Sequence, residues 1–102
     1  MSKKENKTNT IKVASIYSKK EREEIKSKLD ARIKELGVGM PRFLDEILRQ
    51  VEANNKRIEK INGHIGLYTD QLSVKNMYHF FEGRRSDDAR VQILDAYLQI
   101  IE

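Results

Sequence analysis

The sequence predicts a mostly α-helical domain with a small β component, and three observations support that prediction. Apolar residues recur at helical spacing on both sides of a glycine-rich break at residues 37–39. A short segment rich in β-branched residues, Thr10–Tyr17, precedes these helices. Asn62-Gly63, flanked by apolar residues, follows them and is the strongest short-range signal for a β-hairpin. We therefore expect a strand, two helices and a hairpin in that order.

The length of 102 residues suits one small domain. We expect residues 1–9 to form a disordered basic arm and residues 10–102 to form a single domain. Within it, residues 10–69 hold the strand, the helix pair and the hairpin, and residues 70–102 hold C-terminal helices for the core and for dimerisation. The chain has no cysteine, which excludes disulfides and thiolate metal sites. Its polar N-terminus and short apolar runs indicate a cytoplasmic protein.

The first elements follow from local chemistry. Thr10–Tyr17 alternates between two faces, which predicts a strand. Ser18 is a favourable N-cap for a helix over residues 19–36, and acidic residues in its first turns oppose the helix dipole favourably. Gly37 suits the left-handed residue that ends this helix, and proline suits the first turn of the next one, Pro41–Ala53.

The Asn62-Gly63 pair predicts a hairpin over residues 57–68, because a type I′ turn needs two residues with positive φ. This register pairs Ile58 with Leu67. A short helix is the alternative, since the isoleucines of the segment also fit a helical stripe. Two glycines inside such a helix would each cost about 1 kcal/mol relative to alanine, so we favour the hairpin.

The remaining chain is predicted to be helical. A helix over residues 74–81 has Ser73 as its cap and Gly83 as its stop. Ser86 is the expected cap of a final helix that is apolar nearly all round. So broad an apolar surface must be covered by the core or by a partner chain. We expect dimerisation through this helix, by Leu94, Tyr97, Leu98 and Ile101.

Positive charge is unevenly distributed along the chain. The net charge is +4 overall, with +5 over residues 1–20 and +2 over residues 53–69. The other two stretches, residues 21–52 and 70–102, carry −1 and −2. Such segregation suits a protein that binds a polyanion. A solvated lysine-rich tail is the alternative explanation.

No catalytic constellation is apparent in the sequence. His64 and His79 are isolated from any motif, and Asp87-Asp88 is explained as acid at the start of a helix. Neither a phosphate-binding glycine loop nor a metal-ligand spacing occurs. We therefore expect no enzyme, no metal and no other cofactor.

Three DNA-binding architectures fit the predicted order of elements. A strand, two helices around a Gly-Val-Gly turn and a hairpin resemble the winged helix-turn-helix family, here with extra C-terminal helices. Residues 11–49, with Leu36-Gly37-Val38 at the turn, also resemble the ribbon-helix-helix family with a C-terminal helical extension, in which paired strands of a dimer read the major groove. In the third architecture the helix-turn-helix falls late, over residues 76–98, with Arg84 and Arg85 near phosphate.

Hydrogen-bond donors favour the winged arrangement. The predicted strand exposes Lys12 but little else that reads base edges. The second helix offers Arg42 and Arg49 among acidic residues, which suits contacts to phosphate rather than to bases. The hairpin has the highest density of donors, and a two-stranded ribbon fits the major groove. The expected DNA-binding residues are Lys56, Arg57, Lys60, Asn62, His64, Arg42, Arg49 and Lys12.

The order of the predicted elements, the small size and the high content of Lys, Asn and Ile resemble those of accessory DNA-binding proteins of mobile elements. In particular, residues 10–69 resemble the layout of small winged-helix proteins that bind repeats in the transfer origin of conjugative plasmids in Gram-positive bacteria. This resemblance implies a homodimer on short repeated sites of double-stranded DNA, helping a relaxase. A transcriptional repressor would have the same sequence features. A helical adaptor that binds other proteins is the alternative from a different class.

Overall fold

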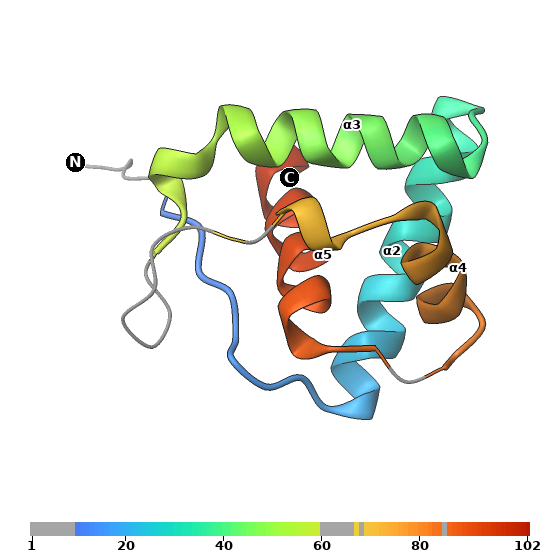
Figure 1. The fold of residues 1–102 in the computed structure, drawn as a ribbon, viewed down its shortest axis with the longest axis horizontal. Coiled ribbons are helices and arrows are strands. Elements are labelled where there is room, and N and C mark those ends of the chain that lie inside the picture. The colour runs from blue at the N-terminus through green and yellow to red at the C-terminus, as the bar shows by residue number, and fades with distance from the viewer. Residues whose placement is uncertain (1–9, 60–66, 68, 85) are drawn as a thin grey trace.

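A computed structural model describes residues 10–59, 67, 69–84 and 86–102 (Figure 1). This part of the chain is mostly helical and has four α-helices and two short 3₁₀ helices. In chain order they are α2 (Lys19–Leu36), α3 (Met40–Ala53), η1 (Asn55–Arg57), η2 (Thr69–Gln71), α4 (Val74–Phe81) and α5 (Asp88–Ile101). The predicted helices are confirmed. Over the described residues the β component is a single isolated bridge.

Both ends of α2 are fixed by local hydrogen bonds. The Ser18 hydroxyl accepts from the Glu21 N–H at 3.1 Å, and the Glu21 carboxylate accepts from the Ser18 N–H at 2.8 Å. This reciprocal pair is a capping box. The backbone N–H of Ser18, followed by its side chain, lowers the pKa of Glu21. Gly37 ends the helix in the left-handed region, at φ +66°, and its N–H donates to the Ile33 carbonyl at 2.9 Å.

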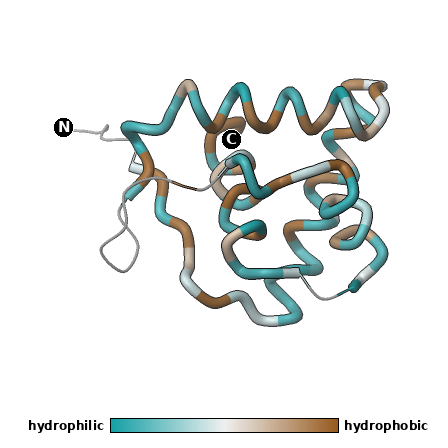
Figure 2. Tube along the Cα trace, in the orientation of Figure 1, coloured by the Kyte–Doolittle hydropathy of each residue, from teal (hydrophilic) through white to brown (hydrophobic). Residues whose placement is uncertain are grey.

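The core forms where α5 packs against both α2 and α3, while α3 also contacts α4 and η2. In Figure 1, α3 lies across α2 and α5. Its hydrophobic positions face α5 and its hydrophilic positions face away (Figure 2). Phe43 and Tyr97, both fully buried, meet edge to face with their ring centroids 5.7 Å apart. None of the helices in the described ranges is long and apolar enough to cross a membrane.

A buried hydroxyl connects three helices. The Tyr97 hydroxyl accepts from Arg32 Nε at 3.1 Å and donates to the Glu46 carboxylate at 3.2 Å. Burial raises the pKa of Tyr97, and the hydrogen bond to this hydroxyl raises the pKa of Arg32. Because Arg32 belongs to α2 and Glu46 to α3, these bonds orient both helices around α5.

The apolar surface of α5 is covered within the single chain. Leu94, Tyr97 and Leu98 are 1%, 0% and 5% exposed, and only Ile101 of the expected dimerisation residues is half-exposed. Dimerisation through the side of α5 that holds Leu94 and Tyr97 is therefore wrong, because α2 and α3 already pack there. The apolar pattern of α5 predicted a helix whose surface must be covered, and other helices of the same chain cover it.

Ser73 and Gly83 bound α4 as predicted, with the Ser73 hydroxyl accepting from a backbone N–H of the first turn and Gly83 at φ +79°. The start of α5 differs from the prediction. Asp87 and not Ser86 stands at the N-cap of α5, and the buried Ser86 instead accepts from Arg22 Nη1 through its carbonyl, at 2.8 Å. The other guanidinium nitrogen of Arg22 pairs with Asp88 at 2.6 Å, so that α2 is joined to the start of α5.

The predicted strand over Thr10–Tyr17 is wrong, because only Ile11 of this segment makes a bridge. The segment runs extended along α5 from the end of η1 to the start of α2 (Figure 1), and we call it the strap. Its side chains still alternate between buried and exposed, although no neighbouring strand pairs with it: Ile11 and Tyr17 are buried, whereas Ile16 is exposed.

Side chains of α5 satisfy backbone groups of the strap that a neighbouring strand would otherwise satisfy. The Gln99 amide accepts from the Lys12 N–H at 3.1 Å and donates to the Lys12 carbonyl at 2.6 Å. Gln92 donates to the Ala14 carbonyl at 2.8 Å. The Tyr17 hydroxyl accepts from the Ala14 N–H and donates to Asp95 at 2.7 Å. These bonds are the physical reason why an alternating segment lies here without pairing as a strand.

Candidate nucleic-acid interface

One parallel bridge joins the strap to the chain after α3. The Ile11 N–H donates to the Arg57 carbonyl at 2.7 Å, and the Glu59 N–H donates to the Ile11 carbonyl at 3.0 Å. Ile11 and Ile58 are both buried there, which anchors the bridge to the core. Thr10, Lys56, Arg57, Ile58 and Glu59 line a surface hollow next to it.

The bridge also brings two basic stretches of the sequence to one place. Residue 10 directly follows residues 1–9, which contain three lysines, and Glu59 directly precedes Lys60. Lys56 is exposed in η1, and Arg57, half-exposed, donates from its guanidinium to the Asn54 side chain at 2.8 Å. Positive charges far apart in the sequence are therefore attached to adjacent points of the fold.

Much of the predicted hairpin lies outside the described residues. This holds for Lys60, Asn62 and His64, and for the Asn62-Gly63 turn itself. On the described flanks, residues 55–57 form a 3₁₀ helix, so the hairpin does not begin at residue 57.

Both flanks of residues 60–66 lie at the C-terminal end of α3. The chain leaves through η1 directly after α3. It returns at Leu67 and Thr69, which line a small hollow together with Val51 and Glu52 of α3, and the Thr69 hydroxyl donates to the Glu52 carboxylate at 3.4 Å. The segment between the flanks therefore starts and ends beside the same helix end.

The exposed face of α3 carries charges of both signs. Arg42 and Arg49 are exposed on it, but so are Asp45 and Glu52. Arg49 forms an ion pair with Glu46 of the same helix. This mixed charge is what the sequence predicted, and it favours contacts to phosphate over deep insertion into a groove. Lys12 is exposed on the strap.

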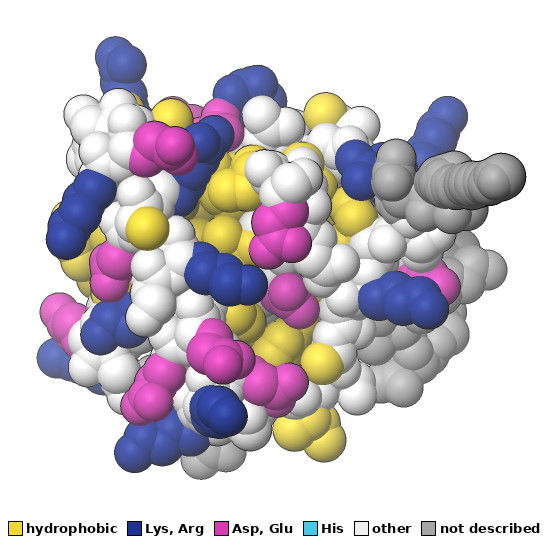
Figure 3. Space-filling view, turned by 180° about the vertical axis from the view of Figure 1, so that it is seen from behind, with side chains coloured by type: hydrophobic (Ala, Val, Ile, Leu, Met, Phe, Trp, Pro, Cys, Tyr) yellow, Lys and Arg dark blue, Asp and Glu magenta, His cyan; other side chains and the backbone are white. Residues whose placement is uncertain are grey.

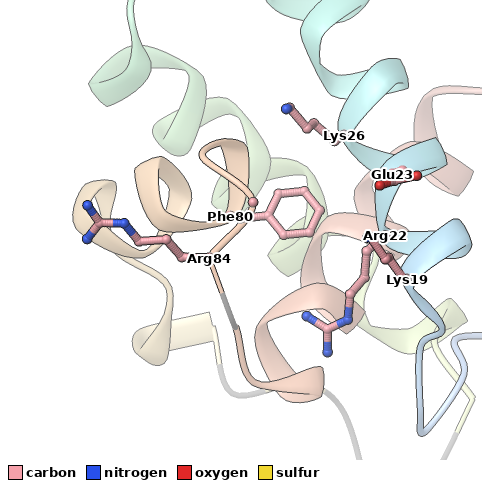
Figure 4. A pocket seen from close by; sticks show the side chains of 7 residues that line it. Lys19, Arg22, Glu23, Lys26, Phe80 and Arg84 are labelled. Atoms are coloured by element: carbon pink, nitrogen blue, oxygen red, sulfur yellow. The ribbon is translucent and has the colours of Figure 1, made fainter.

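A second basic hollow lies between α2 and α4, away from the bridge (Figure 4). It is lined by Lys19, Arg22, Glu23, Lys26, Phe80, Gly83 and Arg84. Its cations do not converge on one point. Arg22 is bonded to Ser86 and Asp88, and Arg84 points away from Phe80 and pairs with Glu82 at 3.0 Å. The late helix-turn-helix reading, which placed Arg84 near phosphate, gains no support from this geometry.

The residues that sequence reasoning missed are the two glutamines that hold the strap. Gln92, Asp95 and Gln99 are spaced i, i+3 and i+7 and form a polar stripe on an otherwise apolar helix. This stripe is visible in the sequence and could have predicted that a polar segment lies along α5. Over the described parts of the chain, no group of three or more histidine, aspartate or glutamate side chains could hold a metal ion.

Comparison with family models, with curated proteins and with solved structures finds no match for this chain.

Proposed function

We propose that this protein binds double-stranded DNA in a sequence-specific manner, as a homodimer. The observation that supports the proposal is the Ile11–Ile58 bridge, because it attaches two lysine-bearing stretches to adjacent points. Clustered positive charge attracts the DNA backbone, and contacts to phosphate supply much of the affinity of such proteins. Lys12, Lys56 and Arg57 add positive charge next to the bridge.

The arrangement we propose is a winged helix-turn-helix. In it α2, the Gly37 turn and α3 form the helix pair, and the chain that follows η1, over residues 58–68, is the wing in the major groove. Support comes from the flanks of this chain, which both lie at the end of α3. Arg42 and Arg49 then touch phosphate. The ribbon-helix-helix alternative has less support, because α5 side chains occupy backbone groups of the strap.

Two cellular roles fit this binding activity. The layout resembles accessory proteins of plasmid transfer origins, which assist a relaxase, and that is the role we favour. A transcriptional repressor is the alternative with the same binding activity. A helical adaptor differs from both, because it predicts weak DNA binding without sequence preference.

Selection of bound sequences from a library of random DNA duplexes tests the proposal. We expect a short motif to be enriched in two copies, because a homodimer presents two equivalent reading surfaces. Binding that is weak, salt-sensitive and without an enriched motif is the behaviour of non-specific electrostatic attraction. That result would contradict sequence-specific binding and favour the adaptor.

A matched pair of double variants tests the location of the interface. Lys56→Ala/Lys60→Ala removes two positive charges from it, and Lys34→Ala/Lys75→Ala removes two from exposed positions on α2 and α4. We expect the first pair to lower the slope of log affinity against log salt by about 0.9 for each lost phosphate contact. The second pair should leave the slope unchanged. Equal losses would mean that net charge alone governs binding and would overturn this location.

Single variants separate base reading from backbone contact. Asn62→Ala should relax the preference for the selected motif with little change in the salt slope, because it removes a neutral donor. Arg49→Ala should weaken binding to all sequences alike and lower the slope. Loss of motif preference in Arg49→Ala with full preference in Asn62→Ala would reverse the assigned roles of α3 and the wing.

A further inference from the structure

A groove runs between α2 and α5 on the face opposite α4. Two hollows form it and share Lys28, Leu98 and Glu102. Its floor contains Ile25, Leu98 and Ile101, which belong to both helices. Figure 3 shows hydrophobic side chains in the middle of this face with charged side chains on either side. An apolar floor framed by charge is a typical feature of a protein-binding surface.

The end of the groove nearest the strap is acidic. Glu21, Glu24 and Asp95 line it, and Glu24 has no ion pair among the described residues. The Lys28 ammonium at this position already pairs with Glu102 across the groove, at 3.5 Å. A partner for this end of the groove therefore needs an apolar group accompanied by positive charge.

The chain itself presents such a group beside the groove. Ile16 of the strap is 76% exposed, more than any other large hydrophobic side chain of the described residues. It directly precedes Tyr17, which lines the acidic end of the groove. Lys19 and Lys20 follow within four residues and are exposed in the first turn of α2. Ile16 is thus attached, through Tyr17, to the acidic end of the groove.

We propose that a second copy of this chain is the occupant, with Ile16 of each protomer inserted into the acidic end of the groove of the other. A two-fold dimer requires one patch to carry both a protrusion and the recess that receives it, and this patch carries both. Lys20 of one protomer then faces the partner's Glu24, so that opposite charges meet around the buried isoleucine.

This inference deepens the homodimer in the proposed function and replaces the interface that the sequence predicted. Leu94 and Tyr97 remain in the core, whereas Leu98 and Ile101 of the predicted set do line the groove. The dimer is tested without DNA. Its failure therefore leaves DNA binding open, and a failure of DNA binding leaves the dimer open.

Sedimentation equilibrium of the full chain tests whether Ile16 inserts into the partner's groove. We expect a dimer at tens of micromolar, and Ile16→Glu should raise the dissociation constant about tenfold or more, because it removes a buried apolar side chain and adds a like charge. Tyr78→Glu is the matched control, since Tyr78 is also exposed but lies on α4, away from the groove. Circular dichroism should show both variants folded. A monomeric wild type, or equal effects of the two variants, would overturn the proposal.

Charge reversal tests the register of the interface. Lys20→Glu and Glu24→Lys should each weaken self-association, because each places like charges opposite one another across the two-fold axis. A mixture of the two variants should form a heterodimer more tightly than either associates alone, since the mixed pair restores opposite charges between protomers. Repulsion within one helix is the same in the mixture as in the separate variants, so the gain reports only contacts between chains. Absence of that gain would contradict this register.

Discussion

The helical core and the strap are held in place by different forces. In the core, α3 and α5 meet through fully buried apolar and aromatic side chains, with Phe43 against Tyr97 at its centre. The strap contributes Ile11 and Tyr17 to that core. Between them it has only the half-buried side chains of Val13 and Ala14 against the core, together with hydrogen bonds to Gln92 and Gln99 of α5. Apolar burial is cooperative and global, whereas a hydrogen bond exposed to water contributes little net stability. The two regions should therefore respond differently to substitution.

The largest effect is expected in the core. Phe43→Ala should lower the free energy of unfolding by about 3–5 kcal/mol, because it removes a fully buried ring and leaves a cavity against Tyr97. Since small domains have total stabilities of about 5–15 kcal/mol, this variant should be close to unfolded. Urea denaturation followed by circular dichroism measures the change.

The control for this variant is Tyr78→Ala, which truncates an aromatic side chain that is 47% exposed. Substitutions at such positions usually change stability by less than about 0.5 kcal/mol. A loss below about 1 kcal/mol in Phe43→Ala would mean that the interface between α3 and α5 is not the centre of the core.

The same contrast explains what could be predicted from the sequence. Helix positions were predicted well, because apolar spacing, Ser18, Gly37 and Pro41 act locally, within one turn of the chain. The strap was predicted as a strand, because alternation indicates which side chains are buried but not what satisfies the backbone. That partner is a pair of glutamines on α5, of which Gln92 is 78 residues from Ala14 and Gln99 is 87 residues from Lys12.

The candidate site shows the same difference between features that local sequence determines and features that distant contacts determine. Its charged residues were predictable from composition, because charge is a property of the sequence itself. Their meeting point was not, because the Ile11–Ile58 bridge depends on a parallel contact between distant segments. Whether α5 is covered by the core or by a partner was equally open, since both bury the same apolar pattern.

An intermediate effect is expected where the strap enters the core. The Tyr17 hydroxyl donates to Asp95 at 2.7 Å and accepts from the Ala14 N–H at 3.1 Å. Tyr17→Phe removes both bonds and leaves a partly buried carboxylate without one donor. The expected loss in the free energy of unfolding is about 1–2 kcal/mol, smaller than in Phe43→Ala.

Alkaline pH provides a second measure of the Tyr17 contact. Burial, followed by the hydrogen bond to Asp95, raises the pKa of Tyr17. The folded state thus favours the neutral phenol, and this contribution is complete below the ordinary tyrosine pKa of about 10 and is lost as the pH rises above it. Urea midpoints of the wild type should therefore fall more steeply above about pH 10 than those of Tyr17→Phe. Parallel curves would mean that Tyr17 ionises as freely in the fold as in the unfolded chain.

The smallest global effect, and the sharpest test of the contrast, is expected from Gln99→Ala. Both hydrogen bonds to Lys12 are exposed to solvent, so water replaces them and the free energy of unfolding should fall by at most about 1 kcal/mol. The local effect should be larger. Hydrogen exchange at the Lys12 amide should accelerate, while amides in α3 keep their protection, because the strap opens without unfolding the helices.

Gln71→Ala is the matched control, because the exposed Gln71 side chain makes no hydrogen bond among the described residues. It should leave exchange at Lys12 unchanged. If Gln99→Ala accelerates exchange in α3 as much as at Lys12, strap and core form one cooperative unit and the contrast fails. If exchange is faster at Lys12 alone, the strap is a separately opening segment that carries the attachment point of residues 1–9. Its hydrogen bonds to α5 then determine how firmly Thr10, to which residues 1–9 are attached, is held beside η1.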